Sequence, residues 1–247
     1  MHLVRPFHPL YGAAATLIFT LVLLGVATPL VMIAPTLGLR RWIARAGVRL
    51  ALACIGVPLR VRGLEHLPTG ACIAVANHAS YVDGAVLMAA LPARYTFVVQ
   101  DGASQWPVIG FVLRRVGATF VNRSSMREGA TQTRALIQRV QNGESLAIFA
   151  EGTFEAEPGL LPFKKGAFQI AARAQVPVVP IGIRGTRRLY GGDRRLPRWS
   201  RIEIDVLPAL AVSDDAQRLR EAARAAVLRA CGEGEAPRSP RLAGAEA

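Results

Sequence analysis

The chain is short of several residue types and patterns that would favour other functions. Its cysteines, Cys54, Cys72 and Cys231, form no CxxC pair and no metal-ligand spacing, which argues against a disulfide framework and for a reducing compartment. No Walker, dinucleotide-binding or zinc-ligand pattern occurs, and no GxSxG motif indicates a serine nucleophile. We therefore expect no metal and no bound cofactor. Aromatic residues make up only 6% of the chain, which offers few stacking surfaces for nucleic acid.

Acidic residues are also scarce. The chain has 17 Asp and Glu against 30 Lys and Arg, a net charge of +13, and no acidic residue before Glu65. Lys164 and Lys165 are the only lysines. A GC-rich genome would explain the choice of arginine over lysine but not the shortage of acids. The charge predicts an anionic partner, which could be a membrane surface, nucleic acid or an acidic substrate.

A long apolar stretch occupies the N-terminal part of the chain. Residues 11–35 include no charged side chain, and about 20 apolar residues suffice to cross a hydrocarbon core. A signal peptide or a buried helix are the alternatives, but the run is long for the former and unusually apolar for the latter. We predict that residues 1–56 form a membrane-associating helical segment, with a kink at Pro29. Whether it spans the bilayer or re-enters one leaflet stays open.

Residues 37–56 follow with four arginines near helical spacing, Arg40, Arg41, Arg45 and Arg49. With Trp42 near the polar edge, the pattern is typical of an interfacial helix; an amphipathic core helix with a solvated basic face is the alternative. Most basic residues follow the apolar stretch. This places the main domain on the cytoplasmic face of the inner membrane.

From residue 57 the pattern becomes that of an α/β domain, which we place at residues 57–231. Apolar runs predict strands at 59–62, 73–76, 95–99, 119–122, 146–150, 178–183 and 202–207. Helical patterns lie between several of them, at 84–90, 107–116, 127–141, 166–174 and 214–231. This alternation predicts a mixed, largely parallel sheet covered by helices. Residues 232–247 are expected to be a disordered tail.

The most informative stretch surrounds the strand predicted at 73–76. His78 follows it on a strand-to-helix turn, and Asp83 lies five residues later in the first turn of the next helix. A carboxylate that accepts a hydrogen bond from one ring nitrogen leaves the other nitrogen free to take a proton from a hydroxyl. A core histidine and an ordinary helix-start aspartate are the alternative interpretation. The pair therefore predicts a general base and its orienting partner.

Three further blocks could contribute to the same site. Residues 117–123 (GATFVNR) end a predicted strand on Arg123, a side chain suited to phosphate. Residues 149–153 (FAEGT) end another strand in a turn whose hydroxyl and N–H groups could bind an anion. Residues 176–181 (VPVVPI) form a β-branched run suited to an apolar wall. Each block alone is a weak signal.

Taken in order, NHASYVD, GATFVNR, FAEGT and VPVVPI resemble the four motifs of the glycerolipid acyltransferase family, the first being its H-x-x-x-x-D signature. The resemblance covers about residues 59–206. It implies that His78 is the general base and Asp83 its partner. It also implies that the acceptor's glycerol phosphate is bound by two further groups of residues: Phe120 and Arg123, and Glu151, Gly152 and Thr153.

The third block departs from the family pattern. Ala150 stands where the family usually has proline, and Phe154 and Glu155 stand where Arg-Ser is common. Phosphate recognition there would then depend on Lys164, Lys165 or Arg123. These departures leave the reaction class intact and put the acceptor in doubt.

The resemblance implies an enzyme that moves a fatty acyl chain from acyl-CoA or acyl carrier protein to the sn-2 hydroxyl of 1-acylglycerol-3-phosphate. We expect membrane lipids and the acyl donor as its partners; the oligomeric state is not indicated. Acylation of another lyso-lipid, such as a lysophospholipid or lyso-ornithine lipid, is one alternative. A non-catalytic basic membrane-binding protein is the other. The arginine-rich residues 184–201 could meet lipid headgroups or the donor's phosphates, or form a solvated loop.

Overall fold

The computed structural model describes residues 7–121, 126–192 and 194–236. Within them a seven-stranded sheet has the order β1-β7-β6-β2-β5-β3-β4. Its strands are β1 (Leu59–Arg62), β2 (Ile73–Ala76), β3 (Tyr95–Gln100), β4 (Thr119–Val121), β5 (Ser145–Phe149), β6 (Val178–Arg184) and β7 (Ile202–Val206). All neighbours pair in parallel except β6 and β7. The mixed, largely parallel sheet predicted from the sequence is confirmed.

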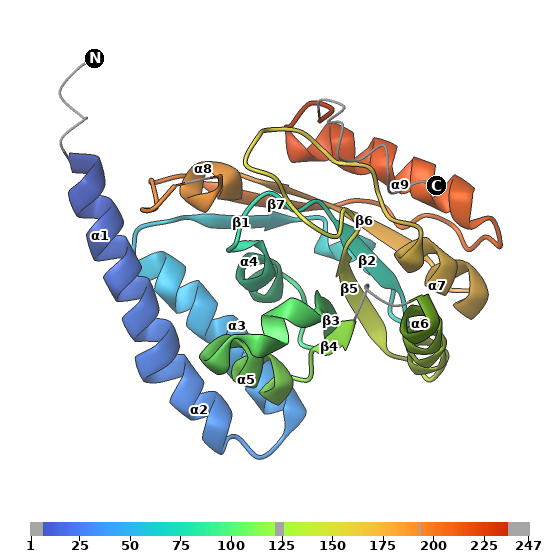
Figure 1. Cartoon of the computed structure of the whole chain (residues 1–247), viewed down its shortest axis with the longest axis horizontal. Coiled ribbons are helices and arrows are strands. Elements are labelled where there is room, and N and C mark those ends of the chain that lie inside the picture. Colours follow the sequence, from blue (N-terminus) through green and yellow to red (C-terminus); the bar gives the residue numbers. More distant parts are fainter. Residues whose placement is uncertain (1–6, 122–125, 193, 237–247) are drawn as a thin grey trace.

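Helices cover both faces of this sheet (Figure 1). One face carries α3 (Leu37–Cys54) and α4 (Asp83–Ala90), with α5 (Pro107–Arg115) beyond them. The other carries α6 (Met126–Gln141), α7 (Gly166–Ala174) and α9 (Ala216–Cys231). Strand β2 alternates between the two cores, since Ala74 contributes to the first cluster and Val75 to the second. Both cores therefore hold β2, and with it the turn that follows, in the centre of the molecule.

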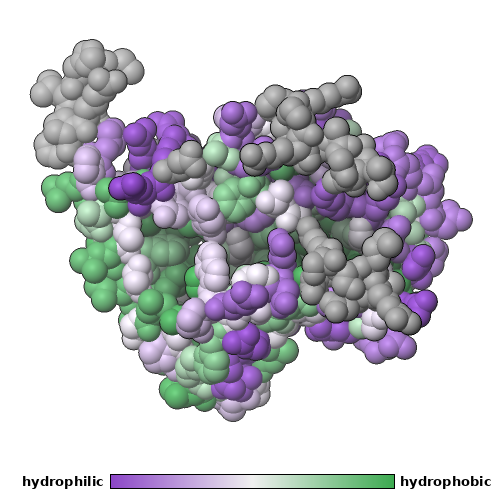
Figure 2. Space-filling model, viewed as in Figure 1, coloured by the Kyte–Doolittle hydropathy of each residue, from purple (hydrophilic) through white to green (hydrophobic). Residues whose placement is uncertain are grey.

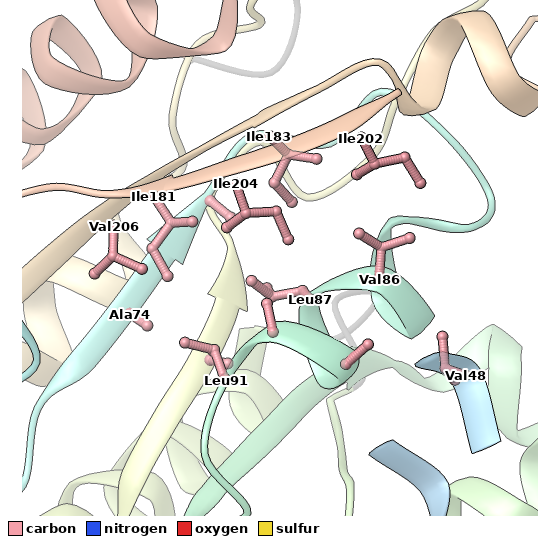
Figure 3. Packing of buried hydrophobic residues seen from close by; sticks show 14 of the residues in the cluster. Val48, Ala74, Val86, Leu87, Leu91, Ile181, Ile183, Ile202, Ile204 and Val206 are labelled. Carbon is pink, nitrogen blue, oxygen red and sulfur yellow. The ribbon is translucent and has the colours of Figure 1, made fainter. Parts of the chain in front are cut away.

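The core on the α3–α4 side joins the N-terminal helices to the sheet (Figure 3). Val48 and Leu52 of α3 are buried beside Val86 and Leu87 of α4, against strand residues such as Ile204. Fully burying one such side chain contributes roughly 1.5–3 kcal/mol. Helix α3 is thus part of the main hydrophobic core.

The sequence predicted every strand within two residues. The helical patterns at 84–90, 107–116, 127–141, 166–174 and 214–231 correspond to α4, α5, α6, α7 and α9. The short elements were not predicted: α8 (Thr186–Tyr190) and the 3-10 turns η2 (Leu64–His66) and η3 (Asp101–Gln105). A helix of one or two turns has too few residues to show a 3.6-residue period.

The N-terminal apolar stretch forms a continuous helix made of α1 (Phe7–Thr20), the π-helical segment η1 (Leu21–Ala27) and α2 (Thr28–Ile33). The three follow one line in Figure 1, so the prediction of a kink at Pro29 is wrong. The wider π register just before Pro29 accommodates its ring and missing N–H. The helix then reverses into α3, and the two pack closely: a Cβ on Gly47 would lie 2.5 Å from the Ala27 Cβ.

Three arginines of α3 bond carbonyls of the main domain, which the sequence did not indicate. Arg41 donates to the carbonyls of Val116 and Ala93, and Arg45 and Arg49 both donate to the Ala89 carbonyl near the end of α4. Terminal helix carbonyls lack intrahelical partners and attract cations. The arginines therefore join the N-terminal helices to the main domain.

The chain after α9 is ordered further than predicted. Residues 232–236 form a strap alongside Leu160, with backbone hydrogen bonds from the Leu160 N–H to the Gly234 carbonyl and from the Ala236 N–H to the Leu160 carbonyl. The prediction of disorder is therefore wrong for these five residues. Residues 237–247, the rest of the predicted tail, lie outside the described residues.

Candidate active site

The site lies where two neighbouring parallel strands end. β2 pairs with β5 so that Ala76 is opposite Phe149, and the residues that follow each strand come together at the same edge of the sheet. His78 follows β2 and Glu151 follows β5. Clefts beyond the carboxyl ends of parallel strands are the usual ligand sites of open α/β sheets. The first and third sequence blocks thus meet.

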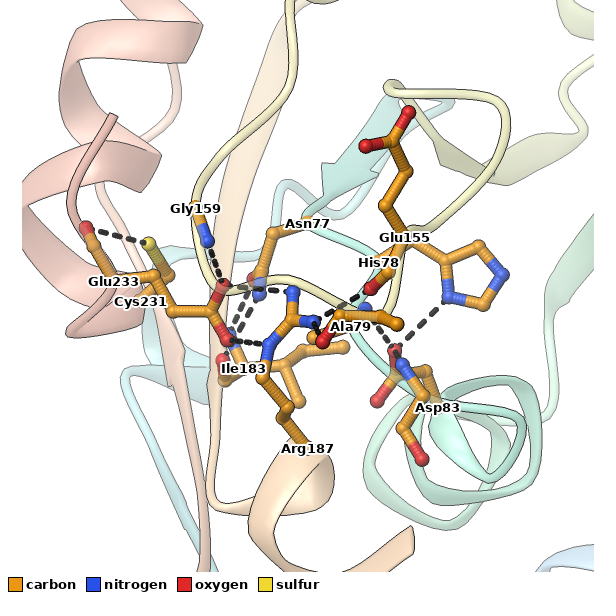
Figure 4. Close-up of polar contacts among 12 residues, drawn as sticks. Asn77, His78, Ala79, Asp83, Glu155, Gly159, Ile183, Arg187, Cys231 and Glu233 are labelled. Atoms are coloured by element: carbon orange, nitrogen blue, oxygen red, sulfur yellow. Dashed lines mark hydrogen bonds and ion pairs between the residues drawn. The ribbon is translucent and has the colours of Figure 1, made fainter. Parts of the chain in front are cut away.

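Asp83 organises the turn that carries His78. Its Oδ2 accepts hydrogen bonds from His78 Nδ1 at 2.9 Å, from the Ala79 N–H at 2.6 Å and from the Ser80 N–H at 2.8 Å (Figure 4). The Asp83 side chain is fully buried, in the first turn of α4, where the helix dipole favours a negative charge. One carboxylate oxygen therefore fixes both the turn and the imidazole ring.

The hydrogen bond to Asp83 assigns roles to the two ring nitrogens. A carboxylate oxygen can only accept, so Nδ1 carries the proton and Nε2 has a free lone pair. The His78 side chain keeps 19% of its surface exposed, while Asp83 keeps none. A free Nε2 lone pair on a partly exposed side chain can take a proton from a hydroxyl.

Glu151 bonds to the backbone on both of its oxygens. Oε1 accepts from the His78 N–H at 2.6 Å, and Oε2 accepts from the Leu161 N–H at 2.7 Å. The residue is 2% exposed, and burial raises the pKa of its carboxyl to about 8, more than the two hydrogen bonds lower it. Glu151 thus connects the His78 turn to the chain beyond the third block.

Two more polar side chains hold the same turn from the other side. The Asn77 amide exchanges both its hydrogen bonds with the backbone of Ile183 in β6, at 2.7 and 3.0 Å. The Ser80 hydroxyl donates to the Tyr190 carbonyl at the end of α8. Buried side-chain amides need both partners, and this one has them. The turn is therefore bound to β6, α8 and the chain after β5.

Aromatic rings enclose the imidazole. Phe149 stacks on His78 with centroids 4.3 Å apart, and Phe154 lies against it at 4.7 Å in a tilted arrangement. Tyr81, which is 61% exposed, makes an edge contact with Phe154. The rings exclude water from the faces of His78 and restrict its orientation.

The other predicted site residues are more scattered. Gly152 adopts a left-handed conformation with φ 77°, which a side chain would disfavour, and Thr153 is exposed beside it. Phe120 lies in the edge strand β4, three strands from β2, a separation of roughly 14 Å at the usual strand spacing. Arg123 lies outside the described residues.

An ion pair at the back of the site was not visible in the sequence. Arg187 of α8 bonds Glu233 of the C-terminal strap through two nitrogens, at 2.6 and 2.9 Å. Arg187 also donates to the Glu155 and Ala156 carbonyls, and Glu233 accepts from the Gly159 N–H at 3.0 Å (Figure 4). Residues 152–159, which include Phe154, are thus fixed beside His78. Partners 46 residues apart give no local sequence signal.

Comparison with known proteins gives consistent matches. The family model described as Acyltransferase matches residues 58–184. A chloroplastic 1-acyl-sn-glycerol-3-phosphate acyltransferase from Brassica napus is 37% identical over 131 residues, which are 52% of this chain and 38% of that protein. An enzyme of the same name from Neisseria gonorrhoeae is 33% identical, over 54% of this chain and 52% of its own length. The chain spans about half the length of the curated relatives it matches.

A solved structure matches almost the whole chain. The crystal structure of the 1-acyl-sn-glycerophosphate acyltransferase PlsC from Thermotoga maritima has a TM-score of 0.74 and 20% sequence identity, and the match covers 90% of this chain and 95% of that one. The likeness extends the shared fold beyond the residues that the family model matches.

Proposed function

This chain belongs to the acyltransferase family, and we propose that it moves a fatty acyl chain from acyl-CoA or acyl carrier protein to the sn-2 hydroxyl of 1-acylglycerol-3-phosphate, giving phosphatidic acid. The names of the relatives support this acceptor. The observation that carries the proposal is the His78–Asp83 hydrogen bond, which leaves the Nε2 lone pair free on a partly exposed side chain at the carboxyl edge of the sheet.

The reaction proceeds directly between the two substrates. His78 Nε2 takes the proton of the acceptor hydroxyl as its oxygen attacks the thioester carbonyl carbon. The C–S bond then breaks, and the imidazolium returns the proton to the departing thiolate. Asp83, buried and hydrogen-bonded to Nδ1, stabilises the imidazolium while it exists. The thioester is already activated, so the steps need no metal.

Recognition of the acceptor phosphate rests on few cations. Lys164 is exposed, and its backbone N–H bonds the Ala150 carbonyl at 2.7 Å, which places it next to the third block. Lys164, Lys165 and Arg123 are the proposed phosphate-binding side chains. A different lyso-lipid acceptor is a second candidate. The apolar ring of Phe154 lies beside His78, at a position where Arg-Ser is common in the family that the third block resembles.

The N-terminal helices supply the proposed membrane contact. The stretch His8–Ile33 is long and apolar enough to cross a bilayer, and only 11% of its most apolar window is buried (Figure 2). Exposed apolar side chains continue along α3, at the residue before α5 and along α5, among them Leu37, Trp42, Trp106 and Ile109. Such a surface fits the interior of a membrane better than water.

Both ends of the His8–Ile33 helix contact the main domain, which bears on how it meets the membrane. Near one end a Cβ on Gly12 would lie 2.9 Å from the Pro197 carbonyl oxygen, and at the other end Arg115 donates to the Met32 carbonyl. A helix crossing a hydrocarbon core of about 30 Å would carry its ends to opposite sides. We therefore propose that the helix lies against one leaflet. The excess of arginine after the apolar stretch supports a placement of the domain at the cytoplasmic face of the inner membrane.

A panel of acceptors tests the proposed reaction. The detergent-purified chain is incubated with acyl-CoA or acyl carrier protein and, in parallel, with lysophosphatidate, lysophosphatidylcholine and a lyso-ornithine lipid. Fastest acylation of lysophosphatidate supports the proposal, and fastest acylation of another acceptor favours the second candidate. A Lys164→Ala variant should raise KM for lysophosphatidate and leave that for neutral acceptors unchanged.

A further inference from the structure

We propose that the basic loop, residues 194–201 between α8 and β7, binds the headgroups of an anionic membrane and fixes one end of the N-terminal helix on it. The proposal rests on the membrane association proposed above and adds a lipid preference to it. The loop begins after the short helix α8, and Figure 1 shows this segment reaching across to α1. Its sequence, RRLPRWSR, combines four arginines with leucine and tryptophan.

Contacts with the helices hold the loop in place. The Trp199 indole N–H donates to the Gly56 carbonyl at 2.7 Å, and the Arg198 N–H donates to the Leu189 carbonyl at 2.8 Å. The loop also passes so close to α1 that a Cβ on Gly12 would lie 2.9 Å from the Pro197 carbonyl oxygen. Its orientation relative to α1 is therefore fixed.

Three arginines of this loop differ from Arg184 and Arg187, which precede it in the chain. Arg184 and Arg187 pair with carboxylates inside the protein. Arg195, Arg198 and Arg201 are exposed and form no ion pair within the described part of the chain. Exposed cations left without partners produce a local positive potential.

Apolar side chains accompany this charge and continue the surface of α1. Trp199 is 49% exposed, Leu196 37% and Leu10, near the start of α1, 70%. Figure 2 shows hydrophilic residues directly beside the apolar surface of α1 at the upper left. Arginine and tryptophan next to an apolar helix are suited to the headgroup region, with the leucines below it.

Charge identifies the class of lipid. A zwitterionic surface offers the guanidinium groups little net attraction, whereas anionic headgroups contribute about fivefold in binding for each cation held near them. The geometry thus points to anionic phospholipid as the partner. Phosphates of the acyl donor present similar chemistry, and the experiment separates the two sources.

The test compares vesicle binding by the full chain and two charge-matched double variants. Arg195→Gln/Arg198→Gln removes two cations from the loop, and Arg218→Gln/Arg229→Gln removes two exposed arginines of α9, which is distant from α1 in Figure 1. Each protein is floated with vesicles of phosphatidylcholine alone or with added phosphatidylglycerol. We expect the loop variant alone to lose roughly 25–30-fold of its affinity for the anionic vesicles.

A second measurement reports on the loop without altering it. Trp42→Phe/Trp106→Phe leaves Trp199 as the only tryptophan. Brominated phospholipid in the anionic vesicles should quench its fluorescence on binding, because the proposal places the indole in the headgroup region. An unquenched Trp199 on bound protein would overturn the proposal whatever the charge variants show.

The remaining outcomes are distinguishable. Equal binding of both vesicle types by all three proteins overturns the lipid preference but leaves the membrane-bound N-terminal helix in place. Absence of binding to any vesicle overturns both. If the loop variant binds vesicles normally but has a raised KM for acyl-CoA in detergent, the arginines serve the donor and the proposal is wrong. Acyl transfer itself, assayed in detergent, tests the reaction separately.

Discussion

The side-chain carboxyl of Glu151 accepts a 2.6 Å hydrogen bond from the backbone N–H of His78, so the first and third sequence blocks are joined through a main-chain group. The other Glu151 oxygen bonds the Leu161 N–H, and neither oxygen reaches solvent in a residue that is 2% exposed. The resemblance to known acyltransferases implied that Glu151 binds the acceptor, and that role stays a prediction. Its contacts support a further role in positioning His78.

The buried carboxyl of Glu151 should make stability depend on pH. Its pKa is about 8 in the folded protein and 4.5 ordinarily, so between these values the folded state binds a proton that the unfolded state does not. This contribution is full below pH 4.5 and is lost as the pH rises through about 8, with a slope of up to about 1.4 kcal/mol per pH unit. Denaturant unfolding of wild type and Glu151→Gln from pH 5 to 8 should show this slope only in wild type.

Glu157→Gln provides the control for this experiment, because Glu157 is an exposed carboxyl in the same loop. Its stability should follow the wild-type pH dependence. If the unfolding free energies of wild type and Glu151→Gln depend on pH in the same way, the raised pKa of Glu151 is contradicted.

Replacing Asp83 should impair the chemistry more than the fold. Asp83→Asn keeps an oxygen that can accept from the Ala79 and Ser80 N–H groups but removes the negative charge that orients His78 and stabilises its protonated form. We expect kcat to fall by about one to two orders of magnitude, the scale of general-base effects. Asp101→Asn, at the end of β3 on the same sheet edge, is the control and should stay near wild type. Activity of Asp83→Asn within twofold of wild type would contradict the role.

The ion pair between Arg187 and Glu233 should stabilise the chain around the site. Both side chains are less than one fifth exposed, so Glu233→Ala leaves a largely buried guanidinium unpaired, at a cost of about 2–4 kcal/mol in unfolding free energy. Glu235, two residues along the same strap, pairs with Arg224 but is 65% exposed. Glu235→Ala should cost less than about 1 kcal/mol. If denaturant unfolding shows the same loss of unfolding free energy for Glu233→Ala and Glu235→Ala, the Arg187–Glu233 pair has no special role.

Arg41 of α3 should stabilise the fold through its hydrogen bonds and not only through its charge. Arg41 donates to the Val116 and Ala93 carbonyls and to the Thr96 hydroxyl. Arg41→Met leaves these acceptors without their donor, which should lower the unfolding free energy by at least about 2 kcal/mol. Arg60→Met, at an exposed position of β1, removes the same charge and should change it by less than about 0.5 kcal/mol. A Tm shift common to both variants would contradict this account.

Local patterns were sufficient to predict the sheet. Apolar runs such as 73–76 and 178–183 are fully buried strands. Such a run consists of consecutive residues, so it can be recognised from the sequence alone. The same holds for His78 and Asp83, whose spacing of five residues on a strand-to-helix turn is a local property.

What the sequence did not reveal depends on partners far apart in the chain. The basic pattern of α3 is the same whether its arginines meet lipid or helix ends, and only the packing of α3 on α4 decides between the two. The strap at 232–236 has the composition of a tail, yet Glu233 finds Arg187 and the Gly159 N–H. Such contacts are set by the tertiary fold, and composition alone cannot predict them.

The most direct test of the central claim is acyl transfer by the detergent-purified chain, wild type beside His78→Ala, with acyl-CoA and lysophosphatidate. If His78 is the general base, the variant should keep its thermal stability and lose 10²–10⁴-fold of its rate, as about this much is contributed by a positioned base. A His78→Ala protein that transfers acyl chains within tenfold of wild type would contradict the mechanism.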